Sequence, residues 1–324
     1  MAKLTVLMAS YNAAGFLPYS IKSILEQTLS DFDFLIIDDG STDNTEHVVK
    51  SFNDIRIKYH KKNNSGLGDS LNYGLNLAST ELIARMDADD IALPDRLQKQ
   101  YHFFTANKSY DVISSWYTMF EGNKILYTVK TAESDEEIKK RFALHSDIMH
   151  PACMFRKDKI LNEGGYKPFV FEDYELWLRI KDNVKFYNLQ EELMLVRYRS
   201  DSYSRKDIIK KNKMVYDIQS PYYDENFSKR FKLSDQEALK LRGWREFFYG
   251  TEKKASQYWK KLNPGIFSDS RILIASIVLL FPQSFILWFK ENRVKFRLMY
   301  FMKYFKSKNA YMRKFLASYI KKAQ

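Results

Sequence analysis

Cysteine is almost absent from this chain of 324 residues, in which Cys153 is the single example. One cysteine excludes an intrachain disulfide and gives no basis for a cysteine-ligated zinc site, so we expect a reducing, cytosol-facing location. The first residues pass directly into an alternating strand pattern. They lack the long apolar region and the cleavage site of a signal peptide, and none is expected.

Long uncharged segments are also rare. The exception, residues 272–289, is interrupted near its middle by Pro282. This segment is at the short end of what a membrane-spanning helix needs, and a proline disfavours a continuous helix. A membrane span, a buried helical hairpin, a re-entrant segment and an interfacial segment all remain open for it.

The positive charge is concentrated at the C-terminal end. The net charge is +12, and residues 290–324 hold eleven Lys and Arg against one acid, a net +10 that leaves +2 for the rest. Aromatic residues alternate with these cations, a composition that an anionic membrane surface attracts. We therefore expect a helical region over 211–324, with the apolar segment at 272–289 and a basic, aromatic, membrane-contacting tail at 290–324.

The first 210 residues have the pattern of an α/β domain, and 45% hydrophobic residues are ample for its core. Alternating strands and helices predict a mostly parallel, mixed sheet flanked by helices. Ligands bind beyond the carboxyl ends of such strands, where polar clusters occur at 10–12, 38–43 and 87–90. Strands are predicted over 4–8, 32–37, 55–60, 81–86, 111–120 and 124–128, and helices over 15–28, 66–77, 95–105, 134–142 and 171–180.

The strand at 81–86 ends in three carboxylates, Asp87, Asp89 and Asp90. Carboxylates about 4 Å apart repel by roughly 1 kcal/mol in water and several-fold more in a partly buried site. A divalent cation with oxygen ligands is the usual means of offsetting that repulsion. In an extended segment Asp87 and Asp89 project to the same side, which suits one ion. Taken alone, the three residues are also compatible with a solvated acidic turn.

Seven ordered motifs together resemble the family 2 glycosyltransferases, which have the GT-A fold. They cover about the first 200 residues, and the C-terminal third shows no comparable match. The motifs are Val6–Asn12, Ile36–Asp43, Asn64–Asn72, Arg85–Asp90 with the trailing Pro94, Arg96, Leu97 and Gln100, His150–Pro151, Gly164–Tyr166 and Glu172–Trp177.

The resemblance implies a Rossmann-like GT-A domain and an inverting transferase that uses a nucleotide-sugar donor. Asp89 would bind Mn²⁺ or Mg²⁺, and Asp87 would contact the ribose or assist the metal. Asp173 would be the general base with Glu172 as its partner, since one carboxylate raises the pKa of the other. The alternative for Glu172 and Asp173 is that both only serve a helix N-terminus.

On the donor side, Ser10, Tyr11 and Asn12 with Asp38 or Asp39 would hold the nucleotide base and the ribose. An aspartate accepts a hydrogen bond from uracil or thymine N3–H, which favours a UDP- or dTDP-sugar. Ordinary turn residues at strand ends are the alternative for this group. The remaining donor-side candidates are Gly66, Asn72, Arg85, Ala88 and Arg199. Arg85 is equally compatible with a purely structural ion pair.

On the acceptor side, His150 resembles the family's acceptor loop, and Trp177 is either a core residue or a platform for a sugar ring. Many members of the family have Tyr-Arg-x-His after the catalytic helix, whereas this chain has aspartate, Asp201, at the histidine position. Asp201 is a further candidate metal ligand, but it does not donate to a phosphate at neutral pH.

These expectations describe an enzyme of surface-polysaccharide synthesis with a glycan or lipid-linked acceptor. It would be peripheral or monotopic at the cytoplasmic face of the inner membrane, with no nucleic-acid partner. A nucleotidyltransferase is one alternative, but residues 9–17 lack the lysine of a phosphate loop. A non-catalytic nucleic-acid-binding protein would explain the basic tail. It would leave the acidic residues at 87–89 and 172–173 without a purpose.

Overall fold

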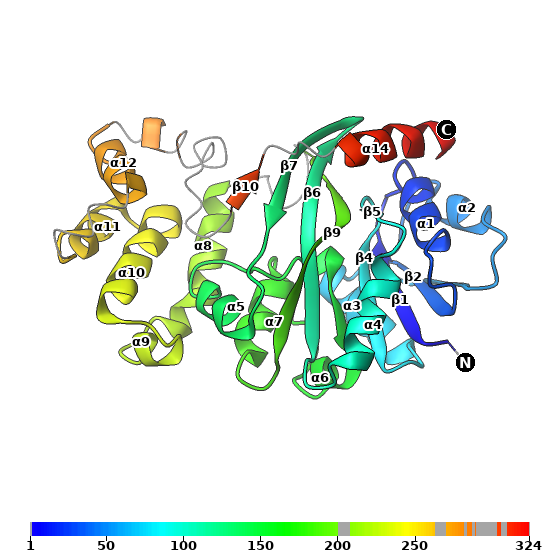
Figure 1. Cartoon of the computed structure of the whole chain (residues 1–324), viewed down its shortest axis with the longest axis horizontal. Helices are drawn as coiled ribbons and strands as arrows, with labels where there is room; N and C mark the ends of the chain where they lie inside the picture. Colours follow the sequence, from blue (N-terminus) through cyan, green and yellow to red (C-terminus); the bar gives the residue numbers. More distant parts are fainter. Residues whose placement is uncertain are drawn as a thin grey trace. The chain divides into compact units, whose positions relative to one another are not determined.

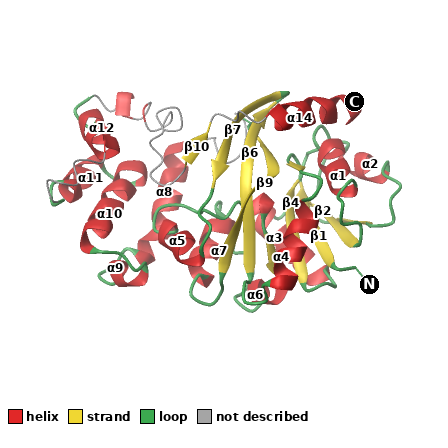
Figure 2. Ribbon diagram, in the orientation of Figure 1, coloured by secondary structure: helices red, strands yellow, loops and turns green. Residues whose placement is uncertain are grey.

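The computed structural model describes residues 2–199, 208–262, 270–281, 284–286, 289, 303–305 and 310–323. The chain divides into two compact units. Unit 1 comprises Met1–Ile138, Asp147–Arg199 and Phe305–Gln324, and unit 2 comprises Lys139–Ser146 and Ser200–Tyr304. Figures 1 and 2 show the sheet of unit 1 and the helices of unit 2. The predicted boundary between a catalytic domain at 1–210 and a region at 211–324 stays a prediction.

Strands and helices alternate in unit 1, whereas most of unit 2 is helical. In chain order they are β1 (Leu4–Ser10), α1 (Leu17–Leu25), β2 (Phe32–Asp38), α2 (Thr45–Lys50), β3 (Ile57–Lys61), α3 (Leu67–Leu77), β4 (Leu82–Asp87), β5 (Ile91–Ala92), α4 (Arg96–Ala106), β6 (Val112–Glu121), β7 (Lys124–Lys130), α5 (Asp135–Arg141), η1 (His150–Ala152), β8 (Met154–Arg156), α6 (Lys157–Leu161), α7 (Glu172–Ile180), β9 (Phe186–Arg197), α8 (Ile208–Gln219), η2 (Ser220–Tyr222), α9 (Phe227–Arg230), α10 (Asp235–Tyr249), α11 (Glu252–Trp259), α12 (Ser270–Val278), β10 (Lys303–Phe305) and α14 (Ala310–Ala323).

The sheet of unit 1 is mixed, as predicted. Its strands follow the order β7-β6-β8-β4-β1-β2-β3, and β9 pairs with β5 and β6. Strand β1 is parallel to β2 and β4, β2 is parallel to β3, and β6 is parallel to β9, whereas β7, β8 and β5 pair antiparallel. The predicted α/β class and each predicted strand and helix up to α7 are present. Strands β5, β8 and β9 were not predicted.

The central parallel strands β1, β2 and β4 are buried because helices flank them (Figure 2). In β2 every residue but Asp33 is buried, and β4 is buried from Leu82 to Met86. Helix α3 approaches the sheet so closely that a methyl group at Gly74 would overlap the side chain of Leu7 in β1. Glycine at this position thus lets α3 pack on β1 and places the N-terminal end of α3 beside the carboxyl ends of the strands.

The C-terminal helix α14 packs on unit 1 (Figure 1). The hydroxyl of Tyr319 donates to the backbone oxygen of Tyr19 at 2.9 Å. The apolar side chains of α14 are therefore buried within the protein and are not available to a lipid surface, which limits the predicted membrane contact of the tail. The shared core contains Met312, Leu316, Tyr319 and Ile320 of α14 with Ile91, Leu93, Phe120 and Leu195.

The uncharged stretch at 272–289 begins in α12, which ends at Val278. Pro282 lies outside the described residues. Among the residues described, no helix combines the length and the apolar character that crossing a bilayer requires.

Unit 2 has an aromatic core of its own. The indole of Trp244 lies 5.0 Å from that of Trp259 and stacks on Phe248 at 5.2 Å between ring centroids. The guanidinium of Arg245 lies over the rings of Tyr216 and Tyr223, at 3.5 and 4.3 Å from their centroids. These contacts join α10, α11 and α8 into a compact helical unit.

Removing the buried part of one α14 side chain tests whether this helix belongs to unit 1. Leu316 has no exposed surface, so Leu316→Ala should lower the free energy of unfolding by about 2–5 kcal/mol. Lys314 is exposed on the same helix, and Lys314→Ala should change it by less than about 0.5 kcal/mol. Urea titration followed by tryptophan fluorescence measures both. Equal, small effects would show that α14 does not pack on unit 1.

Candidate functional site

The three polar clusters predicted at strand ends lie side by side. Ser10 at the end of β1 pairs with Asp38 at the end of β2, and Ala9 pairs with Asp87 at the end of β4. The convergence expected from a parallel sheet is therefore confirmed by the strand register.

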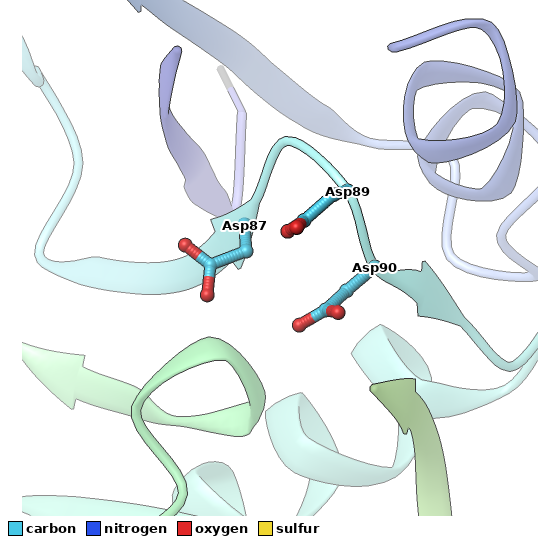
Figure 3. Close-up of side chains that lie close together, drawn as sticks. All are labelled: Asp87, Asp89 and Asp90. Atoms are coloured by element: carbon cyan, nitrogen blue, oxygen red, sulfur yellow. The ribbon is translucent and has the colours of Figure 1, made fainter. Parts of the chain in front are cut away.

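The acidic turn after β4 forms a compact set of oxygen ligands. Asp87, Asp89 and Asp90 each offer a carboxylate oxygen, and these oxygens lie within 4.8 Å of one another. Figure 3 shows the three side chains around one space, with Asp87 at the end of the strand and the other two on the turn that follows. The side chains of Asp87 and Asp89 are partly open to solvent, whereas Asp90 is buried. The donor set suits a divalent cation that prefers oxygen ligands.

The charges of this turn are costly without a cation. Burial raises the pKa of Asp89, and the charge of Asp87 adds to the effect. Burial and the charges of Asp89 and Asp87 raise the pKa of Asp90 well above its ordinary value. One oxygen of Asp90, Oδ2, has no hydrogen-bond partner among the described residues. A buried carboxylate oxygen without a partner, beside two further carboxylates, fits a site built to receive a metal ion.

Helix α1 holds the backbone of the acidic turn. The hydroxyl of Ser20 shares its hydrogen between the backbone oxygens of Ala88 and Asp90, at 2.8 and 2.7 Å. The hydroxyl of Ser23 accepts from the backbone N–H of Ala92 at 3.1 Å. We did not predict either serine. The available signal was two serines three residues apart on a helix face that is otherwise apolar.

Arg197, the last residue of β9, and Arg199, two residues further on, approach the same turn. The backbone N–H of Arg197 donates to Asp90 Oδ1 and its side-chain Nε donates to the backbone oxygen of Asp89, both at 2.8 Å. The Arg197 guanidinium also lies 4.5 Å from the centroid of the Phe120 ring. Arg199 Nη1 lies 3.5 Å from Asp89 Oδ2. Arg197 is thus committed to the turn, while Arg199 lies at the candidate metal site, as a donor-side residue would.

Arg85 is a buried cation between the acidic turn and helix α7. It is 2% exposed, and its Nη2 lies 2.5 Å from Asp87 Oδ1. Burial alone would lower the pKa of Arg85, but the neighbouring Asp87 and Glu172 outweigh burial and the pKa is raised. Its Nε and Nη1 have no hydrogen-bond partner among the described residues. Both interpretations from sequence, a partner of the acidic cluster and a donor-phosphate ligand, are compatible with this placement.

The second carboxylate pair begins α7. Glu172 is 7% exposed, and burial together with the charge of Asp173 raises its pKa to about 8. Burial also raises the pKa of Asp173. A carboxyl group with a raised pKa is suited to accept a proton, and the roles of Asp173 as general base and Glu172 as its partner stay predictions.

The predicted acceptor-side residues adjoin this pair. His150 Nδ1 lies 3.8 Å from Glu172 Oε1, and its Nε2 lies 2.9 Å from the hydroxyl of Tyr166. Burial and the charge of Arg85 lower the pKa of His150, which is therefore neutral at pH 7. Trp177 is fully buried edge-on to the His150 ring, at 6.1 Å between centroids. Trp177 is packed in the core here, and an acceptor role for either residue stays a prediction.

Asp39 organises the loop that opens α3. It accepts from Lys62 Nζ at 2.6 Å and from the backbone N–H groups of Ser65 and Gly66 at 2.9 and 2.8 Å. Gly66 has a φ of +95°, a left-handed conformation that glycine adopts without strain. Hydrogen bonds from Lys62, Ser65 and Gly66 outweigh burial and lower the pKa of Asp39. The structure gives Gly66 and Asp39 one shared role, shaping the loop beside β2.

The remaining nucleotide-side candidates are also connected to each other. Asp38 is buried and accepts from the backbone N–H of Ser41 at 2.8 Å. Asn12 has a φ of +48° and its Oδ1 accepts from the backbone N–H of Thr42 at 2.8 Å. Ser10 is 3% exposed, and Tyr11 is 53% exposed. Tyr11 and Asn12 are thus the exposed members of this group.

Two predicted site residues remain, Asn72 on the donor side and Asp201 as a metal ligand. The side chain of Asn72 is committed to the backbone of Tyr166, accepting from its N–H and donating to its oxygen, both at 2.8 Å. A donor-binding role for Asn72 stays a prediction. Asp201, the aspartate in place of the family histidine, lies outside the described residues.

Comparison with known proteins places the chain in a family. Residues 5–165 match the family model described as Glycosyl transferase family 2. The chain is 31% identical over 242 residues to the O-antigen biosynthesis glycosyltransferase WbnJ of Escherichia coli, covering 68% of this chain and 94% of that protein. It is 32% identical over 235 residues to the Escherichia coli UDP-Gal:alpha-D-GlcNAc-diphosphoundecaprenol beta-1,3-galactosyltransferase, covering 69% of this chain and 85% of that protein. The chain belongs to the family 2 glycosyltransferases.

A solved structure supports the fold. The mannosyltransferase PcManGT from Pyrobaculum calidifontis, in complex with GDP-Man and Mn²⁺, superposes with a TM-score of 0.58. The superposition covers 99% of this chain and 86% of that chain at 13% sequence identity. At this identity the likeness confirms the GT-A fold and nothing finer.

Neutralising the most buried carboxylate of the turn should stabilise the metal-free protein at high pH. Because the folded state raises the pKa of Asp90, it binds that proton more tightly than the unfolded chain. The stability that this proton contributes is fully present below the pKa of Asp90 in the unfolded chain. It is lost as the pH rises through the pKa of Asp90 in the folded protein. In EDTA at pH 8, the free energy of unfolding of Asp90→Asn should therefore be at least about 1 kcal/mol higher than that of wild type. The difference should shrink toward pH 5.

The matched control for this measurement is Asp95→Asn, since Asp95 directly precedes α4 and its side chain is 44% exposed. Chemical denaturation at pH 5, 6.5 and 8 gives the three free energies. Equal pH dependence in Asp90→Asn and wild type would contradict the account of a costly buried charge at this turn.

Proposed function

We propose that this glycosyltransferase is a metal-dependent, inverting enzyme. It would transfer a sugar from a UDP- or dTDP-sugar to a hydroxyl of a glycan or lipid-linked acceptor in surface-polysaccharide synthesis. The observation that supports this most is the presence in unit 1 of two sets of carboxylates, the acidic turn after β4 and the pair that begins α7. One set has the spacing of a cation site, and the other has raised pKa values suited to a base.

The acidic turn would hold the donor diphosphate through a cation. Asp89 and Asp87 would be the metal ligands, with Mn²⁺ or Mg²⁺ as the ion and Asp201 as a further candidate. A bound cation would offset the negative charge that develops on the departing nucleoside diphosphate. Arg199, 3.5 Å from Asp89, and Arg85 are cations placed to contact the same phosphates.

The carboxylate pair of α7 would activate the acceptor. Asp173 would take the proton of the acceptor hydroxyl while its oxygen forms the new bond to the anomeric carbon. The bond from that carbon to the diphosphate oxygen breaks in the same step, so the configuration inverts. Glu172 would be the partner carboxyl, and its own pKa is raised to about 8 by burial and by the charge of Asp173. His150, neutral and 3.8 Å from Glu172, would line the acceptor side.

The names of the relatives and of the superposed structure bear on the substrates. One relative is named for a UDP-Gal donor and a diphosphoundecaprenol acceptor, which supports a UDP-sugar and a lipid-linked acceptor for this chain. The solved mannosyltransferase is bound to GDP-Man and Mn²⁺, which supports a metal ion but shows that the GT-A fold also accepts another base. The preference for uridine or thymidine rests on Asp38 or Asp39 as the acceptor of the base N3–H, in addition to the hydrogen bonds that both carboxylates accept within the protein.

The expected location follows from the acceptor. A lipid-linked acceptor requires the enzyme to work at a membrane, and we propose a peripheral or monotopic position at the cytoplasmic face. No observation among the described residues favours a nucleotidyltransferase or a nucleic-acid-binding protein over this function.

The donor site is tested by binding and hydrolysis across UDP-, dTDP- and GDP-sugars with Mn²⁺, with Mg²⁺ and with EDTA. We expect metal-dependent binding of one nucleotide class, lost by at least about a hundredfold in Asp89→Ala because the diphosphate loses its cation. Asp95→Ala is the matched control, an acid-to-alanine change on the neighbouring helix boundary. The proposal would be abandoned if no nucleotide sugar bound under any metal condition.

The base is tested by the pH dependence of transfer. Because Asp173 must be deprotonated and burial raises its pKa, the turnover number should rise with pH and level off only above the ordinary titration range of an aspartate. Asp173→Asn should lower turnover by about 10²–10⁴-fold with donor binding retained. Glu172→Gln should keep the rise with pH, because burial still raises the pKa of Asp173. Loss of that rise in Glu172→Gln would mean that Glu172, and not Asp173, is the group whose deprotonation controls turnover.

A further inference from the structure

The outer face of α12 and of the three residues after it is unusually apolar. Of the twelve large hydrophobic side chains that are exposed in the described part of the chain, six lie within residues 273–285, and the others are scattered. Leu280 is 84% exposed. The side chains used below are Leu273, Ile274, Ile277, Leu280 and Phe281.

The opposite face of the same helix is already packed. Ile272, Ala275 and Val278 are buried at a spacing of three residues, so α12 has one stripe for its own unit and a second apolar stripe facing outward. A helix on the surface of a globular protein normally carries polar residues on that outer side. Exposed apolar area gathered on one helix indicates an interaction surface.

The neighbouring sequence indicates what binds there. Residues 272–289 contain no charged side chain, and the next eight residues contain Lys290, Arg293, Lys295 and Arg297 against Glu291. An apolar helix face followed directly by a cluster of cations is suited to the boundary between acyl chains and anionic headgroups.

Two observations argue against other occupants. Met312, Leu316, Tyr319 and Ile320 of α14 are buried within unit 1, so the last helix of the basic tail does not supply a lipid-binding face. Pairing of α12 with a second copy of the chain would bring together two copies of the sequence that follows it, in which residues 290–297 hold four cations against one acid, and like charges repel one another.

We propose that the outer face of α12 inserts into the headgroup region of an anionic lipid bilayer. This proposal deepens the proposed function, because it names the surface through which the enzyme would reach a membrane acceptor. The proposed function explains why the enzyme would bind a membrane, and in that respect the proposal rests on it. The two are tested independently, because vesicle binding and donor hydrolysis are measured separately.

Vesicle flotation with the full chain tests the proposal. Wild type should float with phosphatidylcholine vesicles that contain phosphatidylglycerol and bind far less to phosphatidylcholine alone. The double variant Ile277→Asp, Leu280→Asp should bind the anionic vesicles at least about tenfold more weakly, because two inserted side chains become charged. The matched control is Ile55→Asp, since Ile55 is 98% exposed in unit 1, and this variant should float like wild type.

The contribution of the basic residues to vesicle binding is tested separately. Changing Lys290, Arg293, Lys295 and Arg297 to Gln should weaken binding by about fivefold per charge removed, and raising the salt concentration should weaken wild type in the same direction. Binding that is insensitive to these charges would contradict the assignment to anionic lipid.

Two controls separate the possible failures. Donor hydrolysis by the Ile277→Asp, Leu280→Asp variant should equal that of wild type, which shows that unit 1 is folded and that the proposed donor site is unaffected. Vesicle binding equal to wild type in that variant would overturn the proposal. So would a wild type that does not float but elutes as a dimer, with the variant eluting as a monomer, because the face would then be an interface between copies.

Discussion

The repulsion among the carboxylates after β4 is the constraint on which the rest of unit 1 depends. Three carboxylate oxygens lie within 4.8 Å of one another, and the protein holds them there through groups from distant parts of the chain. Ser20 of α1 bonds the backbone of the turn, and Arg197 of β9 bonds both its backbone and Asp90. The turn is therefore a preorganised candidate site for a cation.

The same elements connect the site to the C-terminus. Strand β5 begins directly after Asp90 and pairs with β9, and both strands contribute to the core that contains Leu316 of α14. A helix more than two hundred residues away in sequence thus supports the elements that position the candidate metal ligands. Helix α14 belongs to the core of unit 1, whereas the outer face of α12 is the surface that we propose for membrane contact.

Much of this arrangement could be predicted from sequence, and the failures have physical reasons. The parallel strands were predictable because their apolar runs end in polar turns, which also placed Asp87 beside Ser10 and Asp38. Strand β9 was missed because acidic and polar residues interrupt its middle. The role of Ser20 was not predictable, since a buried serine bonds to backbone oxygens that only the tertiary fold brings near. The burial of α14 was missed because its aromatic and basic composition is equally typical of a membrane-contacting helix.

Direct binding of Mn²⁺, followed by the loss of its free-ion electron paramagnetic resonance signal, tests the central claim. The account predicts one ion per chain, bound more tightly when UDP is present because the diphosphate completes the oxygen ligands. It also predicts that Asp89→Ala removes the binding while Asp95→Ala does not. Absence of binding with and without nucleotide, or binding that Asp89→Ala leaves unchanged, would contradict the assignment of the acidic turn as the metal site.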